Sequence, residues 1–367
     1  MTSGPRGRRV VLACDYFLRY TAMLAGGLAR SGAEVRLLSR SHDGEFGGES
    51  GAARRFVAEA TGRRAAHSAL SGRVRSAAGW RGAARLRSQA RAFAPEVVHL
   101  QESILNDPRL FIAARARPGR FALTVHDPAR HPGDRSSWRI ALSNRALVRA
   151  AGLIFVHGEA LRDELVESVG PRAPVVVVPH GVDAGSAEPL PQRPALLFFG
   201  RHSYYKGLDV LLDAMDAIWQ AVPEATLTVA GEGPVEEHPA LADPRVEVRA
   251  GHVPEADVPA LIAAARCVVL PYRQASQSGV GSLAKAHERP LVASAVGALP
   301  ELLADGSGLL VPPEDPAALA EALTSVLSQR DLAERLARAG AESAARESSW
   351  DAVAAKTLEA YERYLLP

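Results

Sequence analysis

Apolar residues in this chain come in short, nearly continuous runs, with little alternation between apolar and polar positions. In the first half the runs are RRVVLAC (8–14), EVRLLS (34–39), VVHL (97–100), ALTVHD (122–127), LIFVHG (153–158) and VVVVPH (175–180). Such runs predict strands buried on both faces of a parallel sheet. Stretches with helical spacing, for example 20–31 and 81–93, separate most of them. Strand and helix therefore alternate as in a doubly wound α/β domain.

The same pattern restarts after GVDAGSAEPLPQRP (181–194), a segment rich in Pro, Gly and Ser. Strands are expected at ALLFFG (195–200), ATLTVAG (225–231), VEVRAG (246–251), CVVLP (267–271), PLVAS (290–294) and GLLVPP (308–313), and helices at 208–221, 258–265, 316–327, 331–346 and 350–366. We predict two tandem Rossmann-like α/β domains, 1–180 and 195–347, joined by a linker (181–194), with a cleft between them and a last helix at 348–367. In such sheets ligands bind where the strands end at their carboxyl side.

Charge divides the chain into two unlike halves. The first 180 residues hold 28 Arg and no Lys against 15 acidic residues, whereas the remainder holds 15 basic and 26 acidic residues. Ten Arg and a single acid, Glu59, lie between residues 51 and 95. This basic face either meets an acidic acceptor or an anionic membrane surface, or is only the solvated side of helices. The absence of a recognisable nucleic-acid-binding motif argues against nucleic acid as a partner.

No apolar run reaches membrane-spanning length, and the first one is too short for the core of a signal peptide. Cys14 and Cys267 lie in strand patterns without neighbouring Cys or His, which predicts buried, reduced thiols. We therefore expect a cytoplasmic protein, with peripheral contact to the inner face of the membrane left open. The Arg-rich, Ala-rich, Lys-poor composition indicates a bacterial source.

Charged and glycine-rich turns follow the predicted strands of the second half. In RHSYYKG (201–207), Arg201 and Lys206 flank the entrance to a helix. A guanidinium can bind two oxygens, an ammonium adds a point charge, and the free N–H groups of a helix start favour an anion. The turn therefore suits a diphosphate, although its spacing taken alone favours two solvated loop cations.

The order of the motifs is more specific than any one of them. RHSYYKG is followed at compatible spacing by VAGEGP (229–234), AGHVP (250–254), LPYRQASQSGV (270–280), RPLVASAVGALPELL (289–303) and GLLVPPEDPAALAEAL (308–323). From about residue 175 to 327 the chain resembles the C-terminal domain of glycosyltransferase family 4, retaining enzymes of the GT-B fold that use nucleotide sugars. The last helix resembles the family's final helix, which packs back on the N-terminal domain. GLARSGAEVRLL, PEVVHL, LTVHD and IFVHGEAL carry a looser resemblance in the first half.

The resemblance implies positions for both substrates. Arg201 and Lys206 match the pair that binds the donor diphosphate and neutralises the leaving nucleotide, with no metal or other cofactor required. His126 matches a strand-end histidine that faces donor sugar and acceptor; the alternative is that it only hydrogen-bonds within the wall of the cleft. Asp127 either orients that histidine or an acceptor hydroxyl, or is a turn residue. The resemblance thus assigns catalysis to His126, Arg201 and Lys206; donor binding also to Gly231, Gly251, His252, Val253, Gln277, Ser278, Gly279 and Val280; and the acceptor side to Tyr20, His126 and Asp127.

Two features depart from the family pattern. The usual Gly-Gly turn after the first strand is absent, and Gly26-Gly27 falls inside the expected helix, where it predicts close packing. The second departure is the loss of two Glu eight positions apart, since Ala275 and Leu283 stand in their places and Glu288 comes too late to replace them. Backbone groups and small polar side chains of SQSGV (276–280) would then form the cradle for the donor, and Lys285 is expected to point to solvent.

The leading hypothesis is a glycosyltransferase that moves a hexose-type sugar from a UDP- or GDP-sugar to an unidentified hydroxyl of a glycan, a lipid-linked precursor or a small molecule. The missing carboxylates leave open a non-catalytic protein that binds a nucleotide sugar. A nucleotide-sugar epimerase shares the two-domain fold, but it needs a set of acid/base side chains around the sugar. The C-terminal loops show no such cluster.

Overall fold

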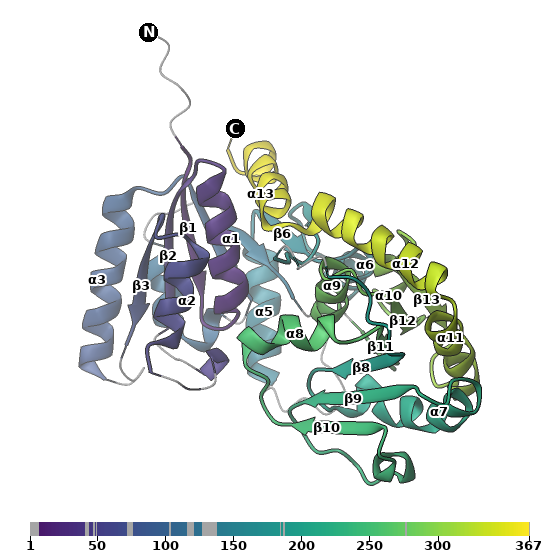
Figure 1. Ribbon diagram of the computed structural model, residues 1–367. Coiled ribbons are helices and arrows are strands. Elements are labelled where there is room, and N and C mark those ends of the chain that lie inside the picture. The colour runs from purple at the N-terminus through teal and green to yellow at the C-terminus, as the bar shows by residue number, and fades with distance from the viewer. Residues whose placement is uncertain are drawn as a thin grey trace. The chain divides into compact units, whose positions relative to one another are not determined.

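The computed structural model describes residues 7–40, 44–46, 48, 50–71, 76–102, 104–115, 121–126, 138–183, 185, 188–275 and 277–366. The chain forms two compact units, Met1–Gly181 with Trp350–Pro367, and Val182–Ser349. Each unit is built on one parallel sheet with helices between its strands (Figure 1).

The sheet of the first unit has the strand order β3-β2-β1-β4-β5-β6-β7. Its strands are β1 (Arg9–Cys14), β2 (Glu34–Arg40), β3 (Ala65–Leu70), β4 (Val97–Gln101), β5 (Ala122–Thr124), β6 (Leu153–Val156) and β7 (Val175–Val177). Sequence patterning located every strand except β3, AAHSAL, which pairs with β2 at the sheet edge. Because β3 is mostly half-exposed, it has no continuous apolar run. The last three strands end before the residues predicted for them.

Seven helices accompany this sheet in the described part of the unit. They are α1 (Leu18–Arg30), α2 (Ala52–Ala60), α3 (Ala77–Phe93), α4 (Pro108–Ala114), α5 (Trp138–Ala150), α6 (Glu159–Val169) and α13 (Trp350–Tyr364). Close packing at Gly26-Gly27 is confirmed: a Cβ on Gly26 would lie 2.1 Å from the Ala60 oxygen, and one on Gly27 would lie 2.4 Å from the Trp350 oxygen. These glycines let α2 and α13 approach α1, and α1 and α13 lie side by side in Figure 1.

The sheet of the second unit has the order β10-β9-β8-β11-β12-β13. Its strands are β8 (Ala195–Phe199), β9 (Thr226–Gly231), β10 (Val246–Ala250), β11 (Cys267–Leu270), β12 (Leu291–Ser294) and β13 (Gly308–Val311). Its helices are α7 (Leu208–Ala221), α8 (Val258–Ala263), α9 (Gly279–Ala286), α10 (Leu299–Leu302), α11 (Pro316–Ser328) and α12 (Arg330–Ser343). The chain first builds the sheet outward from β8 to β10 and then returns to the other side of β8. The switch point of this sheet therefore lies between β8 and β11.

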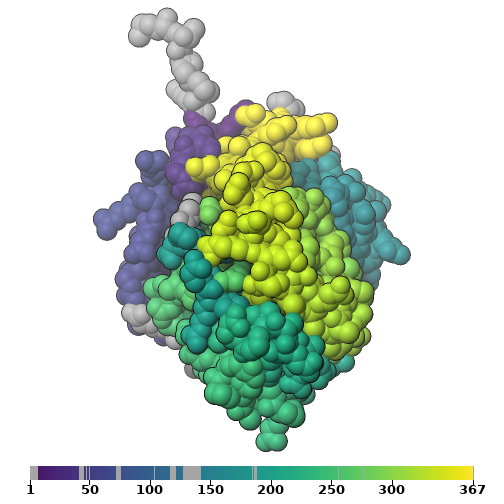
Figure 2. Space-filling model, turned by 45° about the vertical axis from the view of Figure 1, so that its right-hand side comes forward, coloured from purple at the N-terminus to yellow at the C-terminus, as the bar shows by residue number. Residues whose placement is uncertain are grey.

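The two cysteines are buried and unpaired, as predicted. The helix expected at 331–346 is divided, because α12 ends at Ser343 and a short π-helical segment, Ala344–Ser348, follows it. One side of α12 (yellow-green to yellow) faces the viewer in Figure 2 and is not covered by other segments. In the part of the chain that the structure describes, no helix is both long enough and apolar enough to cross a membrane.

Candidate active site

Glycines with positive φ follow or end three neighbouring strands of the second sheet at its carboxyl edge. They are Gly200 (φ 119°), Gly231 (φ 141°) and Gly251 (φ 112°). A Cβ on Gly231 would lie 2.0 Å from the Gly200 oxygen, so this position tolerates only glycine. The Gly251 N–H donates to the Gly231 oxygen at 2.9 Å, and the space around a Gly251 Cβ is open. These three strand ends form a glycine shelf. The space over it is open at Gly251, whereas the Gly200 carbonyl fills the space at Gly231 and the Lys206 side chain borders Gly200.

Lys206 lies at the switch point between β8 and β11. Its Nζ donates to the hydroxyl of Tyr272 at 2.8 Å and lies 4.6 Å from the centroid of that ring. Tyr272 is only 2% exposed, so it is a rigid support for the ammonium. A Cβ on Gly200 would lie 3.0 Å from the Lys206 Nζ and 3.7 Å from Cγ2 of Val280. The ammonium thus lies over the end of β8, close to the start of α9.

Arg201 is the second predicted cation, and its side chain is exposed. It follows Gly200 directly, while Lys206 ends a short helical turn, Tyr204–Lys206, which precedes α7. Both cations therefore belong to the loop between β8 and α7. Within the described residues, Arg201 makes no side-chain hydrogen bond or ion pair, so its guanidinium can reach a ligand without breaking an existing contact.

The start of α9 is built by Ser278, whose Oγ accepts the Gly281 N–H at 3.1 Å. That hydroxyl is the N-cap of the helix and still has its own proton to donate. The neighbouring Gln277 has a buried side-chain oxygen without a hydrogen-bond partner among the described residues. Gly279 and Val280 form the first turn, and the space around a Gly279 Cβ is open. Of the predicted cradle, Ser276 lies outside the described residues.

No carboxylate takes the place of the two absent glutamates in the described part of this loop and helix. Ala275 is buried, and its carbonyl accepts the Ala298 N–H at 3.1 Å. Leu283 packs on the core cluster that includes Leu270 and Leu291. Glu288 follows the C-terminal end of α9 in a left-handed conformation (φ 54°), at the far end of the helix from its entrance. Glu288 is therefore late in the chain relative to this helix, as predicted.

The prediction for Lys285 was wrong. Its side chain is only 8% exposed, its Nζ donates to the Leu302 oxygen at 3.0 Å, and it pairs with the Asp305 carboxylate at 2.5 Å. The sequence could not show this, because Asp305 follows α10 and reaches Lys285 only through the fold. Burial acts to raise the pKa of Asp305, but hydrogen bonds from Lys285, Ser307 and Ser343 outweigh it and hold that pKa below its ordinary value. Lys285 therefore anchors α9 to the end of α10 and to the loop that follows it.

The residues expected to meet the nucleobase lie after β10. His252 is about half exposed, and its Nδ1 lies 3.4 Å from the Glu232 carboxylate. Val253 packs partly on the core cluster of Leu261 and Leu270. The Gly251–Val253 segment thus keeps backbone groups near the surface beside the glycine shelf.

In the first unit, His126 is buried within an aromatic cluster. Its ring stacks on Phe17 with centroids 3.8 Å apart and meets Tyr20 edge-on at 5.0 Å. Nε2 lies 2.9 Å from the side-chain amide of Gln101, and Nδ1 lies 3.2 Å from Nε2 of His157. Both ring nitrogens are thus already engaged by the protein. The hydrogen bonds of the His126 ring therefore run to neighbouring residues of the first unit.

The histidines of this cluster are kept neutral. Burial, followed by repulsion from His157 and His180, places the pKa of His126 well below its ordinary value. Burial lowers the pKa of His157 to about 3, and burial also lowers the pKa of His180. The remaining acceptor-side residues are Tyr20, which is 8% exposed and packs on His157, His180 and Trp350 as well, and Asp127, which lies outside the described residues.

Phe17 and Glu45 occupy the place of the missing Gly-Gly turn. Phe17 precedes α1 with φ 64°, a conformation that costs a non-glycine residue about 1–2 kcal/mol. The Glu45 carboxylate accepts the N–H groups of Leu18 and Arg19 at 3.2 and 3.3 Å. A side chain of the protein therefore already satisfies the anion-binding end of α1, and Phe17 covers His126.

Several of these residues were not predicted from the sequence, namely Phe17, Glu45, Gly200 and Tyr272. In LPYR, Tyr272 follows the buried strand β11 after one residue, Pro271, and a polar group so close to a strand end is the signal that could have identified it. Glu45 carries no such signal, since it acts on a helix that begins 27 residues before it.

Two family profiles match the chain. The profile described as "Glycosyltransferase Family 4" covers residues 18–185, and the one described as "Glycosyl transferases group 1" covers residues 193–329. Glycogen synthase of Mycobacterium tuberculosis is 30% identical over 293 residues, which cover 74% of this chain and 69% of the relative. Phosphatidyl-myo-inositol mannosyltransferase of Mycobacterium leprae is 32% identical over 280 residues, 73% of each chain.

Among solved structures, Anabaena HepE in complex with UDP and glucose matches with a TM-score of 0.72 at 18% identity, over 97% of this chain and 100% of that one. Fold and sequence together define a transferase of the GT-B class, with two parallel-sheet α/β domains. The chain belongs to glycosyltransferase family 4 and is a glycosyltransferase.

Proposed function

We propose that the chain is a retaining glycosyltransferase that transfers a hexose-type sugar from a UDP- or GDP-sugar to a hydroxyl acceptor. The observation that carries this proposal is the position of Lys206, held by Tyr272 over the end of β8 at the switch point of the second sheet. Ligands of open α/β sheets bind at such switch points. The space around Gly251 and around Gly279, at the start of α9, is open, and Arg201 adds a second, exposed cation.

On this proposal each group acts by electrostatics and placement. Lys206 and Arg201 neutralise the negative charge that grows on the leaving diphosphate, and no metal ion is required. The backbone of Gly251–Val253 contacts the base, and the start of α9, with Gln277 and Ser278, faces the sugar and the phosphates. His126 shapes the acceptor side as a neutral wall residue and does not exchange protons, since both of its nitrogens are engaged.

A screen of sugar nucleotides tests the proposal. The protein is incubated with UDP- and GDP-sugars in buffer containing EDTA, and the free diphosphate is measured. We expect slow hydrolysis of one donor, and Arg201→Ala should slow this hydrolysis about tenfold. The effect should be smaller than that of removing a charge-stabilising group that the protein holds rigidly in place. Unchanged turnover in Arg201→Ala would remove the diphosphate role of Arg201. Interconversion of the sugar would indicate an epimerase, and thermal stabilisation without turnover would indicate a binding protein.

We also propose that α3 of the first unit contacts an anionic membrane surface that presents the acceptor. The helix has no acidic residue, and Arg81, Arg85, Arg87 and Arg91 are all exposed, whereas Gly79, Ala83, Leu86 and Ala90 are buried. Trp80 is 43% exposed. An exposed Trp among arginines suits the boundary between lipid headgroups and acyl chains.

Replacing Arg81 and Arg85 with Gln should weaken binding to vesicles that contain anionic lipid, by about 1 kcal/mol for each Arg. Co-sedimentation with phosphatidylglycerol vesicles at low salt measures this. Arg335 and Arg338, which are exposed on α12, are matched controls, and replacing both with Gln should leave binding unchanged. Equal binding by wild type and the α3 variant would refute the proposed contact.

A further inference from the structure

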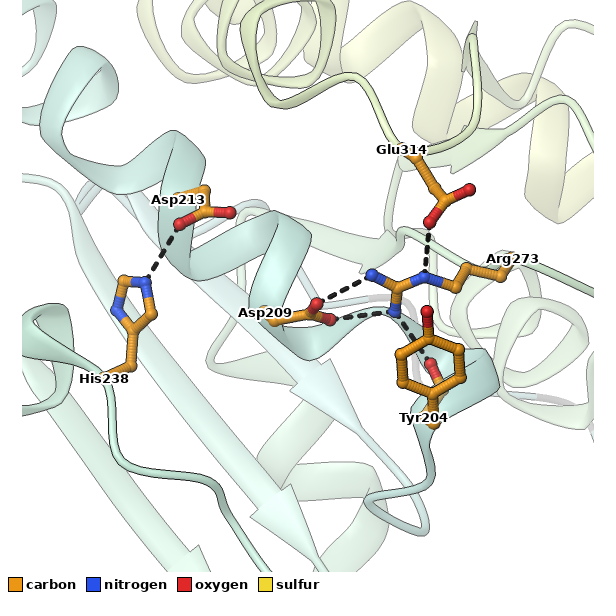
Figure 3. Close-up of polar contacts among 6 residues, drawn as sticks. All are labelled: Tyr204, Asp209, Asp213, His238, Arg273 and Glu314. Atoms are coloured by element: carbon orange, nitrogen blue, oxygen red, sulfur yellow. Dashed lines mark hydrogen bonds and ion pairs between the residues drawn. The ribbon is translucent and has the colours of Figure 1, made fainter. Parts of the chain in front are cut away.

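Arg273 joins three loops at the carboxyl edge of the second sheet. Its guanidinium donates from Nη1 and Nη2 to the Asp209 carboxylate at 2.9 and 2.7 Å and from Nε to Glu314 at 2.8 Å (Figure 3). Asp209 lies in the first turn of α7, and Glu314 lies between β13 and α11 with φ 55°. The Arg273 side chain is 13% exposed, and the hydrogen bonds that it donates to Asp209 in particular raise its pKa above the ordinary value. It is therefore a fixed cation, already bound on several sides.

The same side chain holds the turn that carries Lys206. Nη1 of Arg273 also donates to the Tyr204 oxygen at 2.9 Å, and the guanidinium lies 4.2 Å from the Tyr204 ring centroid (Figure 3). The Arg273 N–H donates to the Tyr205 oxygen at 2.7 Å. Two consecutive carbonyls of the turn are thus attached to one residue of the neighbouring loop.

The two loops run against each other residue by residue. Tyr204 and Tyr205 meet Arg273, Lys206 meets Tyr272, and a Cβ on Gly207 would lie 2.0 Å from the Pro271 oxygen. Lys206 has four rotatable bonds, so its ammonium stays over β8 only if both its backbone and Tyr272 are fixed. Arg273 fixes the backbone of this turn through its bonds to the Tyr204 and Tyr205 carbonyls, directly before Lys206.

We propose that Arg273 is a positioning residue for catalysis, which places the Lys206 ammonium by clamping the 204–206 turn to the loop after β11. This inference rests on the proposed function for its catalytic consequence, but the position of Lys206 can be measured without it. Lysine cannot replace the clamp, because an ammonium lacks the planar fork that spans Asp209 and the Tyr204 carbonyl together.

The first test measures the reactivity of Lys206. The chain has only three lysines, and Lys285 is buried, so acetic anhydride labelling followed by peptide mass spectrometry can compare Lys206 with the exposed Lys356. We expect Arg273→Gln to raise the labelling rate of Lys206 relative to Lys356 several-fold, and Arg273→Lys to raise it as well. A ratio unchanged in both variants would overturn the proposal.

The second test is a double-mutant cycle on donor turnover. Arg273→Gln should lower kcat about tenfold. This is less than the loss expected when the charge-stabilising Lys206 is itself removed, because the ammonium is displaced but still present. If Arg273 acts through Lys206, it should have no further effect in the Lys206→Ala background. Additive losses would overturn the proposal. If Lys206→Ala leaves turnover unchanged while the labelling ratio still rises, the proposed function fails and the positioning role stands.

Arg245 is the matched control. It also forms a forked pair with an aspartate, Asp243, at 2.8 and 2.6 Å, donates to the Pro223 oxygen at 3.0 Å and lies 4.0 Å from the Trp219 ring centroid. It precedes β10 at the opposite edge of the same sheet. Arg245→Gln should alter the melting temperature as Arg273→Gln does, but neither Lys206 labelling nor kcat. An equal effect of both variants on labelling and kcat would mean that Arg273 serves only stability.

Discussion

Replacing Lys206 with Ala is expected to lower kcat for the donor by about 10²–10³-fold, the range found when one preorganised charge-stabilising group is removed. The ammonium is held at 2.8 Å by a buried tyrosine, so it needs no reorganisation as charge develops on the leaving diphosphate. Because this interaction strengthens in the transition state, the loss should fall mainly on kcat and less on KM.

Steady-state turnover of the donor found in the screen measures this effect. Lys206→Arg should retain part of the activity, since it keeps the charge but not the compact ammonium on Tyr272. Lys356→Ala, a change of an exposed lysine on α13, should leave kcat within twofold and is the control for loss of a lysine as such. A Lys206→Ala variant with wild-type kcat would refute the role of Lys206.

Replacing Lys285 with Met is expected to lower the free energy of unfolding by about 3 kcal/mol, the lower end of the range for breaking a buried ion pair. The substitution keeps the stem, which packs against Gly340 of α12, and removes only the charge. The Asp305 carboxylate, 16% exposed, then loses its partner while remaining largely buried. Urea denaturation measures the change.

Asp305→Asn added to Lys285→Met should recover part of this loss, because a neutral amide costs less to leave unpaired than a carboxylate. The exposed pair of Arg330 and Glu334, at 2.7 Å, is the matched control, and Glu334→Gln should change stability by less than about 1 kcal/mol. If Lys285→Met is no more damaging than Glu334→Gln, the pair is not the support of α9 that its burial implies.

The pH dependence of the same pair has a definite sign. The folded state lowers the pKa of Asp305, so the pair stabilises the fold above the ordinary aspartate pKa of 3.8 and this contribution is lost as the pH falls below it. The stability difference between wild type and Asp305→Asn should therefore be constant near neutral pH and shrink in acid. A difference that grows on acidification would contradict the assignment.

Hydrophobic patterning was enough for the class of fold. Continuous apolar runs mark strands buried on both faces, and all of the strands that carry such a run were found. The edge strand β3 was missed because it is half-exposed and therefore carries no continuous apolar run. Gly26-Gly27 was also interpreted correctly, since two glycines inside a helix that is otherwise regular have few explanations besides close approach.

The site was only partly predictable. Arg201 and Lys206 could be selected as candidates because both lie in one loop next to a helix start, where local chemistry is informative. Tyr272, Arg273 and Asp305 act on residues 66, 64 and 20 positions away, respectively Lys206, Asp209 and Lys285. Contacts at such separations are fixed by strand order and by the loops that this order brings together, and neither is encoded in any short stretch.

By itself, the sequence determined that this protein is a pair of parallel-sheet domains of the family 4 type, and it marked RHSYYKG as the candidate turn for an anion. Only the tertiary structure decided which side chains from other loops contact that turn. It placed Lys206 on Tyr272, enclosed His126 beneath Phe17, and turned Lys285 from solvent toward Asp305. Burial of apolar runs can be deduced from periodicity, whereas the pairing of buried polar groups depends on which loops the sheet brings to one edge.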